Sequence, residues 1–470
     1  MKSSIRPLYP TILVIFGVTG DLSQRKLLPA LLHLYQRNAL PRQFCVIGFS
    51  RRDWDDERFR REARAVLMKN MHTTRGVDEF LKMFHFQPGL FHEKESYKNL
   101  AKHIQRIDDR WKICTNTLFH LAVSPEYYPL ILKNLSRQSL TTKCGPKEGW
   151  SRILVEKPFG NDSETAQKLD SMLGAIFREK QIFRVDHYLG KETVQNILAF
   201  RFSNALFEEI WNNKHIEKIE IKLLEKGDVG TRGEYYDATG ALRDVGQNHI
   251  LQMLALIAMD NPMELNGDLI RKNRAKAIQS LKIISGSMLK KRAVRGQYAG
   301  YRNAEEVSPR SRTETYFKIE AYLEGKRWSG VPFYLESGKG LKELKAEIVV
   351  HFKGADPCFC PKDNNEHNHQ NVIIFMIQPS QGITVRFWSK KPGLQMEIEP
   401  RNLTFHYKRD GSLHLSGYEK LLYDAILGDQ TLFSSTQEVL AAWRFITPIV
   451  QGWKKLPLHL YKKGSRRPGE

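Results

Sequence analysis

The segment Thr11–Leu22, TILVIFGVTGDL, constrains the fold of this chain more than any other stretch. Its opening TILVIF is a continuous apolar run, which is typical of a parallel strand buried on both faces. A turn with Gly17 and Gly20 follows, and LSQRKLLPALLHLYQRNAL then places leucines at helical spacing, with Pro29 expected to kink the helix. Phe44–Phe49, FCVIGF, predicts a second buried strand. This order of strand, glycine turn, helix and strand indicates a βαβ unit.

More strands and helices alternate after this unit. Thr117–Ala122 and Arg152–Val155 predict strands, whereas Pro125–Leu135 and Ser163–Lys180 predict helices. Strands that alternate with helices indicate a doubly wound parallel sheet. We therefore expect residues 1–185 to form an α/β, Rossmann-like domain.

The pattern changes beyond residue 185. Segments of alternating apolar and polar residues become frequent, which is typical of antiparallel strands. They are Ile216–Leu224, Thr315–Leu323, Ala346–Phe352, Val372–Ile377 and Ile383–Trp388, with long helical patterns at Ala241–Met259 and Asp268–Met288. We expect residues 186–470 to form an α+β domain with a large, mostly antiparallel sheet. The basic tail after Lys454 contains Pro and Gly and is expected to be partly disordered.

The length and composition fit two domains. The chain has 470 residues, 41% of them hydrophobic, which is enough for a large core. It has no apolar run of roughly 18 residues, so no membrane span is expected, and its N-terminus MKSSIRPLYP has no signal-peptide pattern. The cysteines form no evenly spaced framework, which favours a reducing, cytoplasmic compartment. They are Cys45, Cys114, Cys144, Cys358 and Cys360.

The chain is strongly basic, with 73 Lys and Arg against 52 Asp and Glu and a formal net charge of +21. Such an excess favours anionic partners, although a basic solvated surface is the alternative. No RNP-like aromatic pattern, zinc-finger spacing or heptad array accompanies it, so nucleic-acid binding is a minor hypothesis. The loop 358–369 contains Cys358, Cys360, His367 and His369, but its tight C-x-C spacing predicts an exposed loop rather than a metal site.

The turn GVTGDL, residues 17–22, has the features of a coenzyme-binding turn. Gly17 suits the tight turn after a strand, and Gly20 lets backbone N–H groups approach a pyrophosphate at a helix N-terminus. The pattern is G-x-x-G rather than G-x-G-x-x-G, so an ordinary structural turn is the alternative. Arg51 follows the second strand, where an NAD-binding unit usually has an acidic residue. Unless it is an ordinary surface charge, Arg51 favours NADP over NAD by pairing with the 2′-phosphate.

Two polar stretches follow later strands. EKPFG, residues 156–160, places Lys157 where α/β sheets form their ligand crevice, with an exposed pair before a strand-ending proline as the alternative. RVDHYLGKETVQNI, residues 184–197, has His187 and Lys191 four positions apart, on one face of a predicted helix. Two cations there suit a phosphate, and Tyr188 adds a hydroxyl donor. A polar helix start with solvated charges is the alternative.

His249 lies within the apolar helical pattern ALRDVGQNHILQML. A histidine on such a face is more often a core residue than a catalytic one. Asp244 is five positions earlier, about 140° around an α-helix, which makes it a poor partner for this imidazole. We therefore expect Asp186 to orient His249, and Asp244 to bind a substrate hydroxyl. Glu225 continues the apolar face of its strand, so it lies either at the wet end of the sheet or beside a ligand.

Together these stretches resemble the glucose-6-phosphate dehydrogenase family over nearly the whole chain. GVTGDLSQRKLLPAL resembles its coenzyme turn and first helix, and GFSRRDW resembles its NADP 2′-phosphate segment. EKPFG, RVDHYLGKETVQNI, RDVGQNHILQML and WSGVPFYLESGKGL resemble its other signature stretches in the family's order, and RVDHYLGKE is highly specific. The resemblance implies an NADP-dependent oxidoreductase that converts glucose 6-phosphate to 6-phosphogluconolactone, the first step of the oxidative pentose phosphate pathway.

The resemblance also implies a role for each site residue. His249 would take the proton from the C1 hydroxyl as general base, and Asp186 would hold its imidazole. The 6-phosphate would bind to His187, Tyr188 and Lys191, and the sugar hydroxyls to Glu225, Asp244 and Lys339. The coenzyme would bind to Gly17, Thr19, Gly20, Asp21, Leu22 and Arg51, with Lys157 between coenzyme and substrate. Family members are homodimers or homotetramers, so we expect self-association through the large sheet of the second domain.

Two positions depart from the family pattern. Glu336 stands before Ser-Gly-Lys where the family usually has a basic residue, and Leu344 stands where a second basic residue is usual. Lys342 and Lys345 flank Leu344 and are candidates to compensate. Two alternatives follow: an oxidoreductase that acts on a different sugar or sugar phosphate, and a non-enzymatic relative that senses NADP or binds nucleic acid. The presence of the predicted catalytic and phosphate-binding residues argues against the second.

Overall fold

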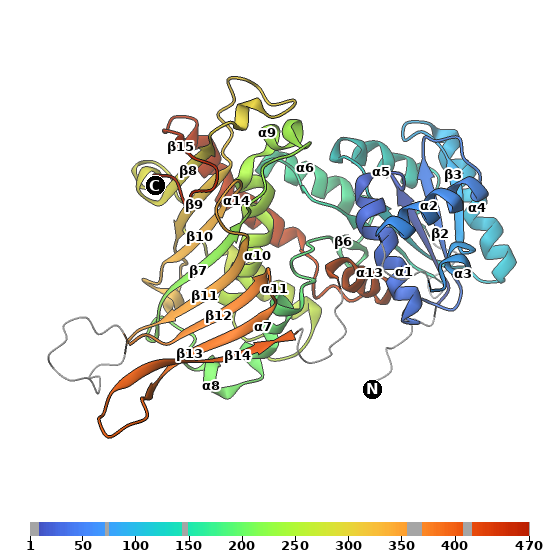
Figure 1. Cartoon of the computed structure of the whole chain (residues 1–470). Coiled ribbons are helices and arrows are strands. Elements are labelled where there is room, and N and C mark those ends of the chain that lie inside the picture. The colour runs from blue at the N-terminus through green and yellow to red at the C-terminus, as the bar shows by residue number, and fades with distance from the viewer. Residues whose placement is uncertain (1–8, 71–74, 143–148, 355–368, 408–415, 470) are drawn as a thin grey trace. The chain divides into compact units, whose positions relative to one another are not determined.

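The computed structural model describes residues 9–70, 75–142, 149–354, 369–407 and 416–469, and the chain divides into two compact units (Figure 1). Unit 1 comprises Met1–Gly160, Glu164–Gly190 and Leu415–Thr436. Unit 2 comprises Asn161–Ser163, Lys191–His414 and Gln437–Glu470. Unit 1 therefore includes a segment from far along the chain, which no sequence pattern indicated.

Unit 1 is built on a six-stranded parallel sheet with the order β3-β2-β1-β4-β5-β6, which confirms the predicted Rossmann-like, doubly wound fold. The strands are β1 (Thr11–Phe16), β2 (Phe44–Ser50), β3 (Phe84–Pro88), β4 (Asn116–Leu121), β5 (Ser151–Val155) and β6 (Ile182–Arg184). Every residue of β1 is buried, as its apolar run predicted. The strand order changes direction at β1, and ligands bind at such a point in α/β sheets.

The helices around this sheet are η1 (Ser23–Leu27), α1 (Leu28–Gln36), α2 (Asp56–Asn70), α3 (Val77–Leu81), α4 (Lys94–Trp111), η2 (Pro125–Tyr127), α5 (Tyr128–Arg137), α6 (Ser163–Gly174), η3 (Glu179–Gln181) and α13 (Gly417–Leu427). The π-helical turn η1 continues directly into α1, since Leu27 and Leu28 both have helical backbone angles, and Pro29 stands at the start of α1. The kink expected at Pro29 stays a prediction.

The segment that returns to unit 1 is fixed by its helix. α13 lies beside α1 (Figure 1). Its Glu419 accepts hydrogen bonds from His33 Nδ1 (2.7 Å) and Arg37 Nη1 (2.9 Å) of α1. Ser416 and Glu419 also form a capping box at the start of α13. A carboxylate that is almost completely buried is thus satisfied from two helices distant in sequence.

Unit 2 contains a nine-stranded sheet with the order β14-β13-β12-β11-β7-β10-β9-β8-β15. Its strands are β7 (Ile216–Leu224), β8 (Ala293–Tyr298), β9 (Tyr316–Ala321), β10 (Phe333–Gly338), β11 (Lys345–Phe352), β12 (Val372–Gln378), β13 (Gly382–Lys390), β14 (Ile398–His406) and β15 (His459–Tyr461). Among these described strands, β7 and β10 pair in parallel, as do β8 and β15, and the other pairs are antiparallel. The predicted mostly antiparallel sheet is therefore confirmed.

The helices of unit 2 are α7 (Glu192–Phe202), α8 (Ala205–Glu208), α9 (Gly233–Ala241), η4 (Leu242–Ile250), α10 (Leu251–Ala258), α11 (Gly267–Gln279), α12 (Ser287–Arg292), η5 (Tyr301–Asn303), η6 (Lys326–Trp328) and α14 (Thr436–Trp453). The single helix predicted over 268–288 is two helices, because Leu281 leaves the helix to form a bridge with Leu323. The tail is ordered by β15, which pairs with β8, so the expected disorder after Lys454 is not found in the described residues.

Three further expectations concern the cysteines, membrane spans and the loop 358–369. Cys45 is buried and free, whereas Cys114 is disulfide-bonded, which the unevenly spaced cysteines did not predict. None of the described helices has the length and apolar character needed to cross a membrane. The predicted exposed loop at 358–369 lies outside the described residues, apart from His369.

Candidate active site

The predicted coenzyme turn lies at the carboxyl end of β1, where the strand order changes direction. Gly17 has a φ of +80°, and a Cβ atom there would lie 2.5 Å from the Ala122 carbonyl oxygen and 2.6 Å from Val123 Cγ1. A Cβ at Gly20 would lie 3.1 Å from the Gly17 carbonyl oxygen. Glycine is therefore required at Gly17 and favoured at Gly20. The turn exposes bare backbone, as a pyrophosphate site needs.

The other predicted coenzyme residues extend this turn. The Thr19 hydroxyl lies 3.1 Å from the Ser50 hydroxyl, which joins the turn to the end of β2. Arg51 follows Ser50 directly and is exposed. Asp21 pairs with Arg25 (2.7 Å) on the surface, and Leu22 precedes η1. A bare glycine turn at this point of the sheet fits the pyrophosphate of a nicotinamide coenzyme.

Lys157 follows β5, and its peptide bond to Pro158 is cis. The preceding Glu156 is buried and accepts hydrogen bonds from His120 Nε2 (2.9 Å) and the Tyr418 hydroxyl (3.3 Å). Its carbonyl oxygen accepts a third from the Tyr128 hydroxyl (3.0 Å). The sequence analysis missed His120 and Tyr418, because neither stands in a recognisable motif. These contacts fix the backbone from which Lys157 projects.

The segment Asp186–Gly190 is a turn rather than the start of a helix. α7 begins at Glu192, and Lys191 is its N-cap with extended backbone angles. The prediction that His187 and Lys191 share a helical face is therefore wrong. Asp186 is buried, and its Oδ1 accepts the Tyr188 N–H (2.9 Å), as in an Asx-turn.

The turn also packs on the start of α13. A Cβ at Gly190 would lie 2.6 Å from the Gly417 carbonyl oxygen, so these two segments of the chain touch through glycine backbone. The His187 ring stacks on Tyr418, with centroids 6.2 Å apart and planes 9° apart. The segment that returns to unit 1 thus supports the predicted phosphate-binding residue His187.

His249 lies in the π-helix η4, which continues into α10. Asp244, Asn248 and His249 are all buried. Asn248 donates from Nδ2 to the Asp244 carbonyl oxygen (3.0 Å) and accepts the His249 N–H on Oδ1 (2.6 Å). A π-helix closes hydrogen bonds between residues five apart, so the 140° angle expected for Asp244 and His249 does not apply. The sequence pattern did not predict this helix type.

Lys339 and Glu225 meet at the ends of β10 and β7. The Lys339 ammonium forms an ion pair with the Glu225 carboxylate and lies 5.4 Å from the Tyr236 ring centroid. Lys339 is almost completely buried, whereas the Glu225 side chain is 40% exposed. Asp244 accepts a hydrogen bond from the Tyr235 hydroxyl (3.3 Å). Unit 2 therefore brings together a cation, a half-exposed carboxylate and tyrosines, a combination that suits sugar hydroxyls.

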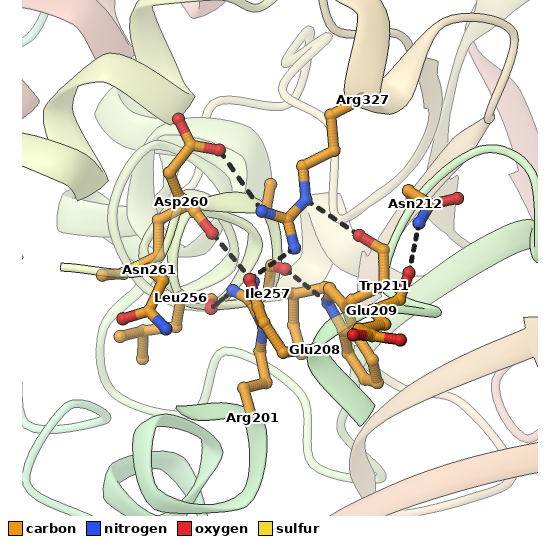
Figure 2. A network of polar contacts seen from close by, with 12 residues as sticks. Arg201, Glu208, Glu209, Trp211, Asn212, Leu256, Ile257, Asp260, Asn261 and Arg327 are labelled. Atoms are coloured by element: carbon orange, nitrogen blue, oxygen red, sulfur yellow. Dashed lines mark hydrogen bonds and ion pairs between the residues drawn. The ribbon is translucent and has the colours of Figure 1, made fainter. Parts of the chain in front are cut away.

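The helix of His249 is fixed at its far end by side-chain donors (Figure 2). Arg201 is fully buried and donates to the carbonyl oxygens of Leu256 (2.8 Å) and Met259 (2.9 Å). Trp211 Nε1 donates to the Ile257 carbonyl oxygen between them (2.8 Å). Trp328 Nε1 donates to the Ala258 carbonyl oxygen (2.8 Å). Four consecutive carbonyl groups that a helix end leaves unpaired are thus satisfied.

The carboxylate of Glu208 links Arg201 to a second arginine, Arg327. Glu208 pairs with both Arg201 (3.4 Å) and Arg327 (2.8 Å), and Arg327 also reaches Asp260 and the Trp211 carbonyl oxygen (Figure 2). Burial lowers the pKa of Arg201 to about 9, and Glu208 opposes this shift. No sequence pattern indicated this cluster, because an arginine within a helix normally predicts a surface charge.

The two departures from the family pattern have different surroundings. Glu336 is buried in β10 and accepts a hydrogen bond from the Tyr316 hydroxyl (2.7 Å), so it is part of the sheet. Leu344 is 44% exposed. Lys345, one of the two candidates to compensate, pairs with Glu347 (3.1 Å).

These features define a nicotinamide-dependent oxidoreductase: a Rossmann-like unit with a glycine turn, and a second unit with a buried histidine and a lysine–glutamate pair. Family models for the glucose-6-phosphate dehydrogenase NAD binding domain and C-terminal domain match residues 14–196 and 198–470. The chain therefore belongs to the glucose-6-phosphate dehydrogenase family.

Individual relatives agree with this assignment. The chain is 41% identical to glucose-6-phosphate 1-dehydrogenase of Borreliella burgdorferi over 97% of this chain and 95% of the relative. It is 37% identical to that of Bacillus subtilis, over 100% and 97%. A solved glucose-6-phosphate dehydrogenase in complex with glucose 6-phosphate matches with a TM-score of 0.89 at 30% identity, over 99% of this chain and 96% of that chain. Levoglucosan dehydrogenase, at 12% identity and a TM-score of 0.51, shares the fold alone.

Proposed function

We propose that this chain oxidises glucose 6-phosphate at C1 to 6-phosphogluconolactone and passes the hydride to NADP⁺. The observation that carries the proposal is the burial of three charged or titratable side chains: Asp186, His249 and Lys339 are 1%, 2% and 3% exposed. Such groups are rarely buried without a partner or a task. Family membership supports the reaction class.

In the proposed reaction, His249 accepts the proton of the C1 hydroxyl as general base. An imidazole suits this role because its pKa ordinarily lies near neutral pH. Asp186 orients the imidazole and stabilises its charged form. The coenzyme, when bound, supplies the hydride acceptor. Loss of the proton from the C1 hydroxyl and of the hydride from C1 itself leaves the lactone carbonyl.

Two groups of residues are assigned to the substrate. His187, Tyr188 and Lys191 hold the 6-phosphate, because two cations and a hydroxyl donor match its oxygens. Lys339, Glu225 and Asp244 hold the sugar hydroxyls, which need donors and acceptors together. Lys157 contributes to both ligands.

NADP⁺ is proposed over NAD⁺ because Arg51 follows β2, where a basic residue can pair with the 2′-phosphate. Arg51→Ala should raise the KM for NADP⁺ about tenfold or more, the effect of losing a charge-assisted contact, and leave that for NAD⁺ unchanged. Arg61→Ala, which removes an exposed charge from α2, is the matched control. An equal loss with both coenzymes would refute the assignment of Arg51.

We also propose that the protein is cytoplasmic and forms homodimers or homotetramers through the nine-stranded sheet. β14 presents Leu403 and Phe405 at 66% and 44% exposure, which is unusual for apolar residues on a solvated strand. Light scattering coupled to gel filtration would measure the mass. A monomer at micromolar concentration would contradict the proposal.

A different sugar substrate is the alternative, since Glu336 and Leu344 stand where basic residues are usual. The test is the rise in reduced-nicotinamide absorbance when purified protein is mixed with glucose 6-phosphate and NADP⁺. Glucose and NAD⁺ replace the two reactants in turn as controls. Turnover that needs both the phosphate and NADP⁺ supports the proposal. Turnover with another sugar, but not with glucose 6-phosphate, supports the alternative.

A further inference from the structure

The backbone of Lys339 is held at both its polar groups. Its N–H donates to the Thr315 carbonyl oxygen (2.9 Å). Its carbonyl oxygen accepts a hydrogen bond from the Tyr461 hydroxyl (2.7 Å), which comes from the last strand, β15. Tyr461 is buried, and this burial raises the pKa of its phenol, so the hydroxyl keeps the proton that it donates at neutral pH.

The donors and acceptors around Tyr461 form one directed chain. The Tyr298 N–H donates to Thr315 Oγ1 (2.9 Å), and Thr315 Oγ1 lies 2.8 Å from the Tyr461 oxygen. The Tyr461 hydroxyl has a single hydrogen to donate. The nearest oxygen that can only accept is the Lys339 carbonyl oxygen, at 2.7 Å. The Thr315 hydroxyl therefore donates to Tyr461, and Tyr461 donates to Lys339. Each group in this buried chain is satisfied in one arrangement.

The residues after Tyr461 continue along the same loop. The Gly464 N–H donates to the Gly340 carbonyl oxygen (2.8 Å), and the Lys342 N–H donates to the Ser465 carbonyl oxygen (3.0 Å). Lys463 pairs with Asp228 (2.8 Å). Together with the Tyr461 bond, the C-terminal segment thus contacts the loop that carries Lys339 at three points, Lys339, Gly340 and Lys342.

The opposite side of this loop is tied to the strand that carries Glu225. The Glu225 N–H donates to the Gly338 carbonyl oxygen (2.8 Å), and the Glu225 carbonyl oxygen accepts the Leu341 N–H (3.0 Å). The Gly340 N–H donates to the Gly227 carbonyl oxygen (2.8 Å). The loop is therefore clamped between the Glu225 strand and the C-terminal segment, with the ion pair of Lys339 and Glu225 at its end.

We infer that the C-terminal segment His459–Ser465 positions Lys339 for the sugar phosphate, with Tyr461 as the positioning residue. This inference rests on the proposed function, which assigns Lys339 and Glu225 to the substrate. Tyr461 does not touch the substrate. Its hydroxyl fixes the main chain from which the Lys339 ammonium extends, and so it sets substrate affinity without entering the chemistry.

The test compares Tyr461→Phe with Tyr301→Phe. Tyr301 is also buried and belongs to the same ring cluster, but its hydroxyl donates to Asp237 (3.0 Å) instead of the Lys339 loop. Binding of glucose 6-phosphate is measured by calorimetry, alongside kcat, both KM values and the melting temperature. We expect Tyr461→Phe to weaken binding and raise the sugar-phosphate KM about tenfold, as for one lost hydrogen bond, with kcat and the coenzyme KM unchanged.

A double-mutant cycle with Lys339→Met decides whether Tyr461 acts through Lys339. We expect Tyr461→Phe to have no further effect on binding in the Lys339→Met background. Equal weakening by Tyr301→Phe, an undiminished effect in that background, or unchanged binding in Tyr461→Phe would overturn the inference. Unchanged binding in Lys339→Met would instead show that the proposed substrate role of Lys339 is wrong, and the inference would fall with it.

Discussion

The two ends of the helix that carries His249 are held by opposite charges and to different degrees. At the start, Gly240 has a φ of +77°, and the buried Glu314 accepts the Leu242 N–H on its carboxylate (3.1 Å) and the Ala241 N–H on its carbonyl oxygen (3.0 Å). At the end, Arg201, Trp211 and Trp328 donate to four consecutive carbonyl groups. A carboxylate at the N-terminus and a guanidinium at the C-terminus both match the helix dipole.

The two ends of this helix differ in how firmly they are held because α10 and η4 differ in composition. Every residue of α10 is buried and, apart from Gln252, apolar, so that half serves packing and is fixed by many donors. η4 contains Asp244, Asn248 and His249, and its wider turns release backbone groups that Asn248 then binds. A helix can therefore be anchored at one end and present polar residues at the other. Substitutions among the donors at the C-terminal end should lower stability. Substitutions of the polar residues in η4 should lower turnover.

The largest expected effect is on turnover. His249→Asn removes the proposed general base, so kcat should fall by roughly 10²- to 10⁴-fold. The melting temperature should be nearly unchanged, because the His249 N–H bond to Asn248 is made by the backbone. Steady-state kinetics and thermal unfolding measure both. A large loss of stability with little loss of kcat would make His249 a core residue.

At the other end, Arg201→Met should lower the free energy of unfolding by about 3–5 kcal/mol, because it leaves two buried carbonyl groups and part of Glu208 without a donor. The kcat of the folded enzyme should change little. Arg327→Met is the control, since Arg327 shares Glu208 but is 26% exposed and should cost less than half as much. Equal losses of stability in both variants would show that the buried Arg201 contributes no more than the partly exposed Arg327. Urea unfolding provides the measurement.

A smaller effect is expected when one indole donor is lost. Trp328→Phe leaves the Ala258 carbonyl oxygen unpaired and should cost about 1–3 kcal/mol. Trp211→Phe, which affects the Ile257 carbonyl oxygen, should cost a similar amount. If either substitution left the free energy of unfolding unchanged, the corresponding hydrogen bond would not stabilise this helix end. The same urea experiment applies.

The smallest effect concerns pH at the start of the helix. Burial raises the pKa of Glu314, and its hydrogen bond to Leu242 and the charges of Arg243 and Arg295 oppose this. The folded protein therefore holds this proton to higher pH than the unfolded chain, whose glutamate has a pKa of 4.5. The stability from this group is present below that pH and declines as the pH rises through the folded pKa.

Glu314→Gln keeps an oxygen for the Leu242 N–H but cannot titrate. The stability of the variant relative to the wild type should therefore increase as the pH rises above 4.5. Urea unfolding at several pH values measures the difference. A difference that stays constant over this range would show that Glu314 has the same pKa in both states.

Local patterns predicted the parts of the fold that depend on neighbours in sequence. β1 and β2 are continuous apolar runs between turn residues, and their burial on both faces follows directly. β8 and β15 were missed because AVRGQY and HLY carry little alternation. They are strands because they pair with each other, and β8 also pairs with β9. Pairing between strands as far apart in the sequence as β8 and β15 cannot be predicted from a local pattern.

In the candidate site, too, local motifs were visible in the sequence, whereas contacts between distant residues were not. The residue types at Asp186, His249 and Lys339 were recognised from short motifs. Their supports were not: Tyr418, Arg201 and Tyr461 act through contacts with residues more than fifty positions away. The angle expected for Asp244 and His249 assumed an α-helix, and a π-helix depends on packing that a periodicity of 3.6 does not describe.

The most direct test of the account uses glucose 6-phosphate deuterated at C1. The protein is mixed with this substrate and NADP⁺, and the reduced coenzyme is analysed by mass spectrometry and NMR. The account predicts that the deuterium appears on the nicotinamide ring, with a slower rate in the hydride-transfer step. Reduced coenzyme without deuterium, or label retained at C1 of the sugar, would contradict oxidation at C1 and with it the roles proposed for His249 and Asp186.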